Sequence, residues 1–215
     1  MRRFLLSISL LFVCTLAFSQ YTLIKPEFYV GTNQGVNLWP NVSFSPKVAQ
    51  NFDVRYKGGF TVRYINLKYF GFQAELNYSQ QGWSETSATG EVYSHRFDYL
   101  ELPILAHIYF GKKNTKFFVN LGPEIRYMVN NEATAPFSEG AGVQQFKEIE
   151  NRFDYGITGG LGVEYRTKKA GAFQLEARYH FGLGNVFNST KKDYFSASNN
   201  QAISVSLVYL FNVLK

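Results

Sequence analysis

The sequence predicts an all-β protein, an eight-stranded antiparallel up-and-down β-barrel that crosses a membrane. Three observations predict this fold. The chain begins with the pattern of an export signal, most of the remainder alternates between apolar and polar residues, and the connections alternate between short and long. At 215 residues, one domain is the natural expectation. The high aromatic share of 18% argues against disorder, because Phe and Tyr supply abundant surface to bury.

The N-terminus is typical of a targeting segment. Two arginines open it, an apolar run from Phe4 to Leu16 follows, and Ala17-Phe18-Ser19 forms a small-x-small cleavage site. The apolar run is shorter than the roughly 20 residues that a membrane-spanning helix needs. We therefore expect a cleaved signal peptide at 1–19 and one barrel domain at 20–215. Cleavage would remove Cys14, the single cysteine, and with it any disulfide or thiolate metal site.

Eight segments show the period-two alternation of strands with one apolar and one polar face. The alternation is clear in 70–79, 153–165, 173–181 and 202–211, and weaker in 27–37, 59–65, 97–110 and 117–128. Most of these segments are near the roughly 9–11 residues that a tilted strand needs to cross a bilayer.

The connections between these segments are sorted by length. Short polar turns are expected at 66–69, 111–116 and 167–171, and long connections at 38–57, 84–95, 129–152 and 183–201. Outer-membrane barrels have short periplasmic turns and long extracellular loops. This order places both termini on the periplasmic side.

Two soluble folds share the alternation, namely a β-sandwich and a lipocalin-like barrel with its apolar face inward. The strand ends favour the membrane instead, because Phe or Tyr stands at both ends of several segments, where rings would sit at the two membrane interfaces. The pairs are Phe70 and Tyr78, Phe117 and Tyr127, and Phe153 and Tyr165.

The formal net charge of +6 raises the question of nucleic-acid binding. Most charged residues alternate with apolar ones and form no concentrated basic stripe along the sequence, so we expect no nucleic-acid partner.

The chain resembles the PorT-like outer-membrane β-barrel family of Gram-negative envelopes. The resemblance rests on Tyr99-Leu100-Glu101-Leu102-Pro103-Ile104, Leu121-Gly122-Pro123, Phe153-Asp154-Tyr155-Gly156 leading into Gly159–Tyr165, and the closing strand Ser204–Phe211. It covers essentially the whole mature chain. It implies an outer-membrane location and a barrel fold. The family's namesake is associated with a type IX secretion pathway, while most members are simply barrel proteins, and no residue here separates the two.

The polar face predicts a charge network inside the barrel. An eight-stranded barrel is just wide enough to be filled by side chains, and buried charges need partners. The alternation places seven residues near the middle of the lumen: Arg63, Glu75, Glu101, Glu124, Arg126, Glu176 and Arg178. With Glu164, five acids face three central arginines, so the count leaves one or two carboxylates to be protonated or bound to water. We interpret the set as structural rather than catalytic or conducting.

Catalysis, cofactors and metals find little support in the sequence. His107 and His180 fall on the polar face and His95 lies beside Ser94 in a predicted loop, and no Ser, His and acid share the spacing of a triad. The glycines at 156, 159, 160 and 162 superficially resemble a dinucleotide loop, but they lie within a strand, where glycine suits curvature or close packing. We expect no enzyme activity, no cofactor and no metal.

Two prolines, Pro103 and Pro123, lie within neighbouring predicted strands. Proline cannot donate to a strand ladder and is usual at bulges. Bulges that set curvature are the first interpretation, and a weakened seam that opens or binds a partner is the second.

The sequence thus predicts a non-enzymatic outer-membrane barrel with a filled lumen, which acts in envelope structure or in surface recognition through its loops. The alternative is an accessory component of a secretion or transport apparatus. Outer-membrane lipid is the expected partner, with envelope or secretion proteins as further candidates, and the oligomeric state stays open.

Overall fold

The computed structural model describes residues 22–38, 42–45, 47, 49–87, 90–134, 149, 151–167, 169–187 and 196–214. The predicted signal peptide therefore lies outside the described residues. Within the described part, no helix has the length and hydropathy needed to span a bilayer.

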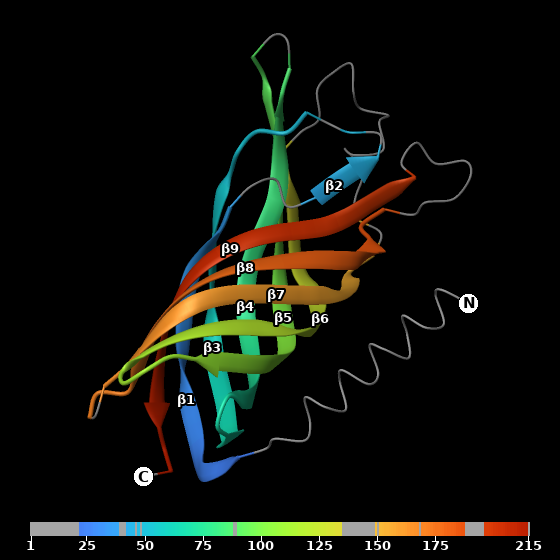
Figure 1. Ribbon diagram of the computed structural model, residues 1–215. Coiled ribbons are helices and arrows are strands. Elements are labelled where there is room, and N and C mark those ends of the chain that lie inside the picture. The colour runs from blue at the N-terminus through green and yellow to red at the C-terminus, as the bar shows by residue number, and fades with distance from the viewer. Residues whose placement is uncertain are drawn as a thin grey trace, which may run out of the picture.

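Eight long strands follow one another around a closed antiparallel barrel. One further, short strand pairs with the last long strand (Figure 1). Their bounds are β1 (Leu23–Leu38), β2 (Val42–Ser45), β3 (Val54–Leu67), β4 (Phe70–Thr86), β5 (Val92–Phe110), β6 (Thr115–Ala133), β7 (Phe153–Arg166), β8 (Ala172–Asn185) and β9 (Ala197–Asn212). The long strands pair with their sequence neighbours, and β1 pairs with β9 from Tyr29↔Asn212 to Leu38↔Ile203. The predicted eight-stranded up-and-down barrel is confirmed.

The outward face of the barrel is apolar. Along β5, for example, Leu100, Leu102, Ile104, Ile108 and Phe110 all point outward and are exposed. Exposed apolar rows of this kind continue around the barrel, which is the surface that a bilayer requires. Aromatic rings lie near both ends of the row on several strands, as Phe117 and Tyr127 do on β6. The apolar row on β5 is about 11 residues long, the length of a membrane-crossing strand.

The strands are longer than the sequence predicted, because several continue beyond the apolar band. On β4 the outward residues change to polar at Gln80 and Ser84, and on β5 they are polar at Ser94 and Arg96. The connection between β4 and β5 is accordingly only residues 87–91, and the long loop predicted at 84–95 is mostly strand.

The remaining connections follow the expected order. The connections from β1 to β3, from β6 to β7 and from β8 to β9 are long and lie at one end of the barrel. Those after β3, β5 and β7 are short and lie at the other end with both described ends of the chain. We call the first end extracellular and the second periplasmic. The β5–β6 turn depends on Gly111, whose φ is +142° and where an added Cβ would meet the Thr115 carbonyl oxygen at 2.5 Å.

The short strand β2 lies in the stretch that was predicted as a loop at 38–57. It pairs antiparallel with the start of β9, from Val42↔Asn200 to Ser45↔Ala197, beside the extracellular end of the barrel (Figure 1). This pairing buries Val42 and Phe44.

The prolines do not form the predicted bulges. The β5–β6 register is the same on both sides of Pro103 and Pro123, and only the pairings between Pro103↔Glu124 and Ala106↔Leu121 are missing. The register shift on this pair of strands lies at Asp98/Tyr99, toward the extracellular end. A proline removes one donor from a ladder without adding a residue, and its fixed φ is compatible with an extended strand.

Candidate functional site

The inside of the barrel is the candidate site, because it gathers most of the buried polar and charged side chains. All seven residues predicted for the lumen point inward, and none is more than 7% exposed. They form three groups at successive depths, which we call the extracellular, central and periplasmic clusters.

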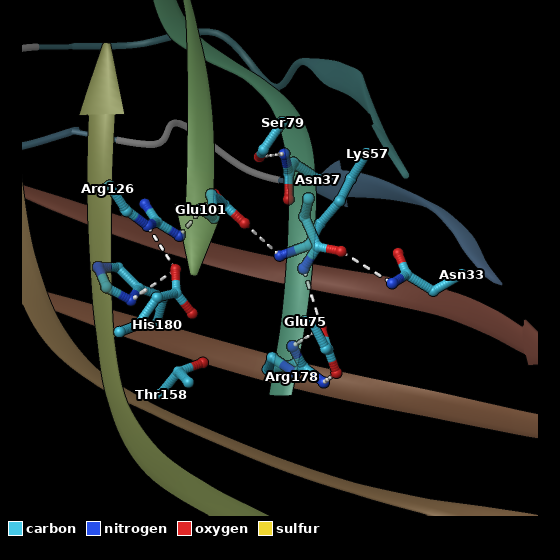
Figure 2. A network of polar contacts seen from close by, with 12 residues as sticks. Asn33, Asn37, Lys57, Glu75, Ser79, Glu101, Arg126, Thr158, Arg178 and His180 are labelled. Atoms are coloured by element: carbon cyan, nitrogen blue, oxygen red, sulfur yellow. Dashed lines mark hydrogen bonds and ion pairs between the residues drawn. The ribbon is translucent and has the colours of Figure 1, made fainter. Parts of the chain in front are cut away.

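The extracellular cluster is built around Glu101 and Arg126 on β5 and β6 (Figure 2). Lys57 Nζ lies 2.6 Å from Glu101 Oε2, and Arg126 Nη2 lies 3.0 Å from Glu101 Oε1. Arg126 Nε also contacts Glu124 Oε1 at 2.5 Å. Gln81 donates to Glu101 Oε1 at 3.0 Å, so the two glutamates and two cations form one continuous group.

The central cluster joins Arg178 on β8 to Glu75 on β4. Arg178 donates from Nη1 to Glu75 Oε2 at 2.8 Å and from Nη2 to Oε1 at 2.7 Å, and its Nη2 also lies 2.8 Å from Glu176 Oε2. Asn77 donates to Glu75 Oε2 at 2.9 Å and Asn120 to Glu176 Oε1 at 2.9 Å. Each carboxylate thus has both an ion pair and an amide donor, as burial requires.

The periplasmic cluster centres on Glu164 of β7. Arg63 Nη1 lies 2.6 Å from Glu164 Oε2, and Arg166 Nε pairs with Glu164 Oε1. Arg166 Nη1 reaches Glu27 Oε2 at 3.2 Å. Gln73 accepts from Arg63 Nε at 2.8 Å and donates to Glu75 Oε1 at 2.5 Å, which links this cluster to the central one.

Several of these contacts cross the full width of the lumen. The strand order around the barrel is β1-β3-β4-β5-β6-β7-β8-β9, so β4 lies opposite β8, and β3 lies opposite β7. The Glu75–Arg178 pair joins the first two strands and the Arg63–Glu164 pair joins the second two. Side chains that tie opposite walls together leave the lumen filled.

Sequence reasoning missed two cations of this network. Lys57 was assigned to a long connection, and Arg166 fell between a predicted strand at 153–165 and a predicted turn at 167–171, but both point inward and pair with glutamates. The expectation of one or two uncompensated carboxylates was therefore wrong, since each of the five predicted acids has a cationic partner. The missed signal was the alternation itself, which continues through Lys57, Gly59 and Thr61 to Arg63.

The histidines have separate surroundings. His180 Nδ1 lies 3.3 Å from Glu124 Oε1 and its Nε2 lies 3.9 Å from Asp154 Oδ2. His107 Nδ1 lies 2.7 Å from Asn120 Oδ1. His95 is buried within β5 and points inward, so its predicted loop position was wrong.

Apolar clusters close both ends of the charged lumen. The extracellular cap consists of Val42, Phe44, Trp83, Tyr93, Phe97, Tyr99, Met128, Ile149, Val186 and Phe187. The periplasmic cap consists of Tyr29, Ile65, Tyr109, Phe118, Ala172, Val208 and Leu210. The sequence predicted neither cap, because the alternation was interpreted as placing only polar residues on the inner face of the barrel.

The extracellular cap lies beyond the apolar band, around fully buried Trp83. Trp83 packs edge-on to Phe44, with ring centroids 5.2 Å apart, and donates from Nε1 to Glu85 Oε1 at 3.0 Å. The His95 ring lies 4.7 Å from the Trp83 ring, and burial lowers the pKa of His95 below its usual value. Burial likewise raises the pKa of Tyr93 to about 12.

Two glycines of β7, Gly160 and Gly162, make room for lumen side chains, in agreement with the close packing predicted for this segment. A Cβ at Gly160 would lie 2.3 Å from Glu176 Oε1, and a Cβ at Gly162 would lie 2.5 Å from Phe118 Cζ. Among the described residues, no group of three or more His, Cys, Asp and Glu side chains is arranged to hold a metal ion. The arrangement binds the barrel walls together through ion pairs between opposite strands.

Comparison with known proteins agrees with this geometry. Residues 18–188 match the model of the outer membrane protein beta-barrel domain family. The chain belongs to this family and is an outer-membrane β-barrel protein. The match ends before β9, which the structure shows to be the strand that closes the barrel. A search of curated proteins found no match.

Two solved structures of outer-membrane proteins are similar to this chain at low sequence identity. The outer membrane protein OprG from Pseudomonas aeruginosa is 12% identical with a TM-score of 0.52, over 86% of this chain and 93% of that chain. Neisserial surface protein A is 11% identical with a TM-score of 0.48, over 87% of this chain and 100% of that chain. The likeness to OprG supports the outer-membrane barrel fold.

Proposed function

We propose that the protein is a non-enzymatic barrel with a closed lumen, which acts in envelope structure or in surface recognition through its extracellular connections. The single observation that carries the proposal is the filled interior. Ion pairs tie opposite walls together at two depths, and apolar caps lie above and below them. A barrel closed in this way presents only its outer surfaces to partners, and loops on a rigid scaffold are where recognition commonly lies.

A second candidate is an accessory role in a protein-secretion apparatus of the type IX class. It is supported by the resemblance of the Tyr99–Ile104, Leu121–Pro123 and Phe153–Tyr165 segments to the PorT-like family. A closed barrel is compatible with this role as a membrane anchor for a larger assembly.

Complementation of a deletion strain separates the two candidates. The strain would receive the wild type, a variant whose residues 135–148 are replaced by a short Gly-Ser linker, which keeps the cap residue Ile149, or a lumen variant such as His107→Gln. A control variant would carry the same linker inserted in the periplasmic turn after Lys169. The readouts are detergent sensitivity of the envelope and the profile of secreted proteins.

For surface recognition or envelope support, we expect the lumen variant and the periplasmic control to restore the envelope, the loop variant to fail, and secretion to be normal in all strains. Loss of a set of exported proteins, with precursors held in the periplasm, would instead establish the secretion role. Failure of the lumen variant alone, while it still folds, would contradict a purely structural interior.

A further inference from the structure

The periplasmic rim of the barrel is basic, although the sequence shows no concentrated basic stripe. Six lysines lie at this end: Lys25 at the start of β1, Lys68 after β3, Lys112, Lys113 and Lys116 around the β5–β6 turn, and Lys169 after β7. Folding brings them together because every short turn of the barrel contributes at least one. Five of them are exposed and Lys116 is partly buried.

The rim lacks matching acids. Among the described residues at this end, the acids are Glu27, which pairs with Arg166, and Glu164, which is buried in the lumen. None of the six lysines forms an ion pair within the part of the chain that the structure describes. At the extracellular end, by contrast, Arg55 pairs with Asp53 at 2.6 Å and Arg96 pairs with Glu132 at 2.6 Å.

The rim lysines lie directly beside the aromatic residues that border the apolar band. Lys68 Nζ lies 5.2 Å from the centre of the Tyr69 ring, Lys112 follows Phe110 by two residues, and Lys116 precedes Phe117. Aromatic rings of this kind sit at the headgroup level of a bilayer, and lysines near it extend their charge into the interface. These three lysines therefore border the interface in which the phospholipid phosphates lie.

One point on the rim is also hollow. A cavity of about 290 Å³ lies between the start of β1, the β7–β8 turn and the end of β9. Its lining includes Arg166, Thr167 and Lys169, together with Phe211, which is exposed on the lipid-facing side of β9. The Glu27 carboxylate in this cavity is already bound by Arg166 and by the Tyr29 hydroxyl, which donates to it at 3.0 Å. A basic cavity next to the lipid face is suited to a headgroup phosphate.

We propose that this rim, Lys25, Lys68, Lys112, Lys113, Lys116 and Lys169, binds anionic phospholipids of the periplasmic leaflet. A protein partner would need the lysines on one side, but they are spread over all three short turns and the start of β1. A ring of lipids around the barrel matches that distribution. The attraction of each lysine for an anionic bilayer surface predicts about fivefold enrichment of an anionic lipid at each contact, and added salt should weaken it.

The test uses the full mature protein folded into vesicles of phosphatidylcholine with a minor fraction of phosphatidylglycerol. After mild detergent extraction, native mass spectrometry counts each lipid that remains bound. The rim variant changes all six lysines to Gln. A control variant changes three extracellular cations, Lys47, Arg96 and Arg152, to Gln. Gel mobility before and after boiling shows whether each variant is folded.

We expect the wild type and the control to retain phosphatidylglycerol severalfold above its share in the vesicle, and the folded rim variant to retain it at that share. Equal retention of both lipids by the wild type would overturn the proposal, as would an unchanged preference in the rim variant. If the rim variant does not fold, the wild type's preference for phosphatidylglycerol is measured again in 0.5 M salt. A preference that persists in this salt contradicts a lysine-based site. A rim variant that keeps its lipids but loses a crosslink to a periplasmic protein would assign the rim to a protein partner instead.

Discussion

Arg178 on β8 and Glu75 on β4 face each other across the barrel and form two parallel hydrogen bonds of 2.7 and 2.8 Å. They are 103 residues apart in the sequence and come from opposite walls. Each is almost fully buried. A bidentate pair in this position fixes the distance between the two walls and blocks the middle of the lumen.

Breaking this pair should destabilise the barrel strongly. The Arg178→Leu variant leaves Glu75 and Glu176 as buried carboxylates without their cation, and removing one partner of a buried pair typically costs about 3–5 kcal/mol. We expect a lower urea midpoint for unfolding in vesicles. The exposed Arg96–Glu132 pair supplies the control, because Glu132→Gln, which leaves the contact between Arg96 and buried Asp98 in place, should change the unfolding free energy by less than about 1 kcal/mol. A midpoint unchanged by Arg178→Leu would refute the stabilising role of the network.

The apolar band predicts how charge is tolerated on the outer face. Leu161 lies midway along β7 and is 66% exposed to the lipid side, so Leu161→Arg should cost about 2–4 kcal/mol in a bilayer. Val92 lies on β5 beyond the band, and Val92→Arg should have almost no effect. Both variants would be compared by unfolding in vesicles. Equal losses of unfolding free energy at the two sites would show that the apolar band has been placed at the wrong depth.

His95 should make the extracellular cap sensitive to acid. Burial beside Trp83 lowers its pKa in the folded protein below the unfolded value of about 6.5. The unfolded form therefore binds the proton more readily, so the stability of the cap is full above that pH and falls as the pH decreases below it. Limited proteolysis between pH 7.5 and pH 5 would measure this as faster cleavage near the cap.

The matched variant for that experiment is His95→Gln, which retains a polar side chain but has no group that titrates in this range. Its cleavage rate should be independent of pH over the same interval. A wild-type cap that resists protease equally at both pH values would contradict the prediction.

Much of the fold could be predicted because lipid-facing and lumen-facing residues alternate along each strand of a membrane barrel. Residues such as Phe173, Leu175 and Tyr179 identified an apolar face, the aromatic strand ends indicated that this face meets the membrane, and the loop lengths predicted the topology. The alternation also identified seven inward charges, although their partners depend on which strands lie opposite each other. That arrangement is set by barrel closure, as in the Arg63–Glu164 pair, and is not visible in one strand.

The features that sequence reasoning missed have physical causes. The four residues of β2 are too few for a periodic signal, and β2 is held by pairing with distant β9. Inward Val208 and Leu210 break the polar alternation because they pack into the periplasmic cap. Pro103 and Pro123 lack the backbone N–H that donates to a strand ladder, yet the register does not shift at either residue. The missing donor therefore did not require a bulge.

Electrical recording across a planar bilayer tests the closed lumen most directly. The folded wild type should add no steady conductance, because the cross-barrel pairs Arg63–Glu164 and Glu75–Arg178 fill the interior. A Phe44→Ala/Trp83→Ala variant, which loosens only the extracellular cap, should also remain closed. Stable open-channel currents from the folded wild type would contradict the account and identify the protein as a pore.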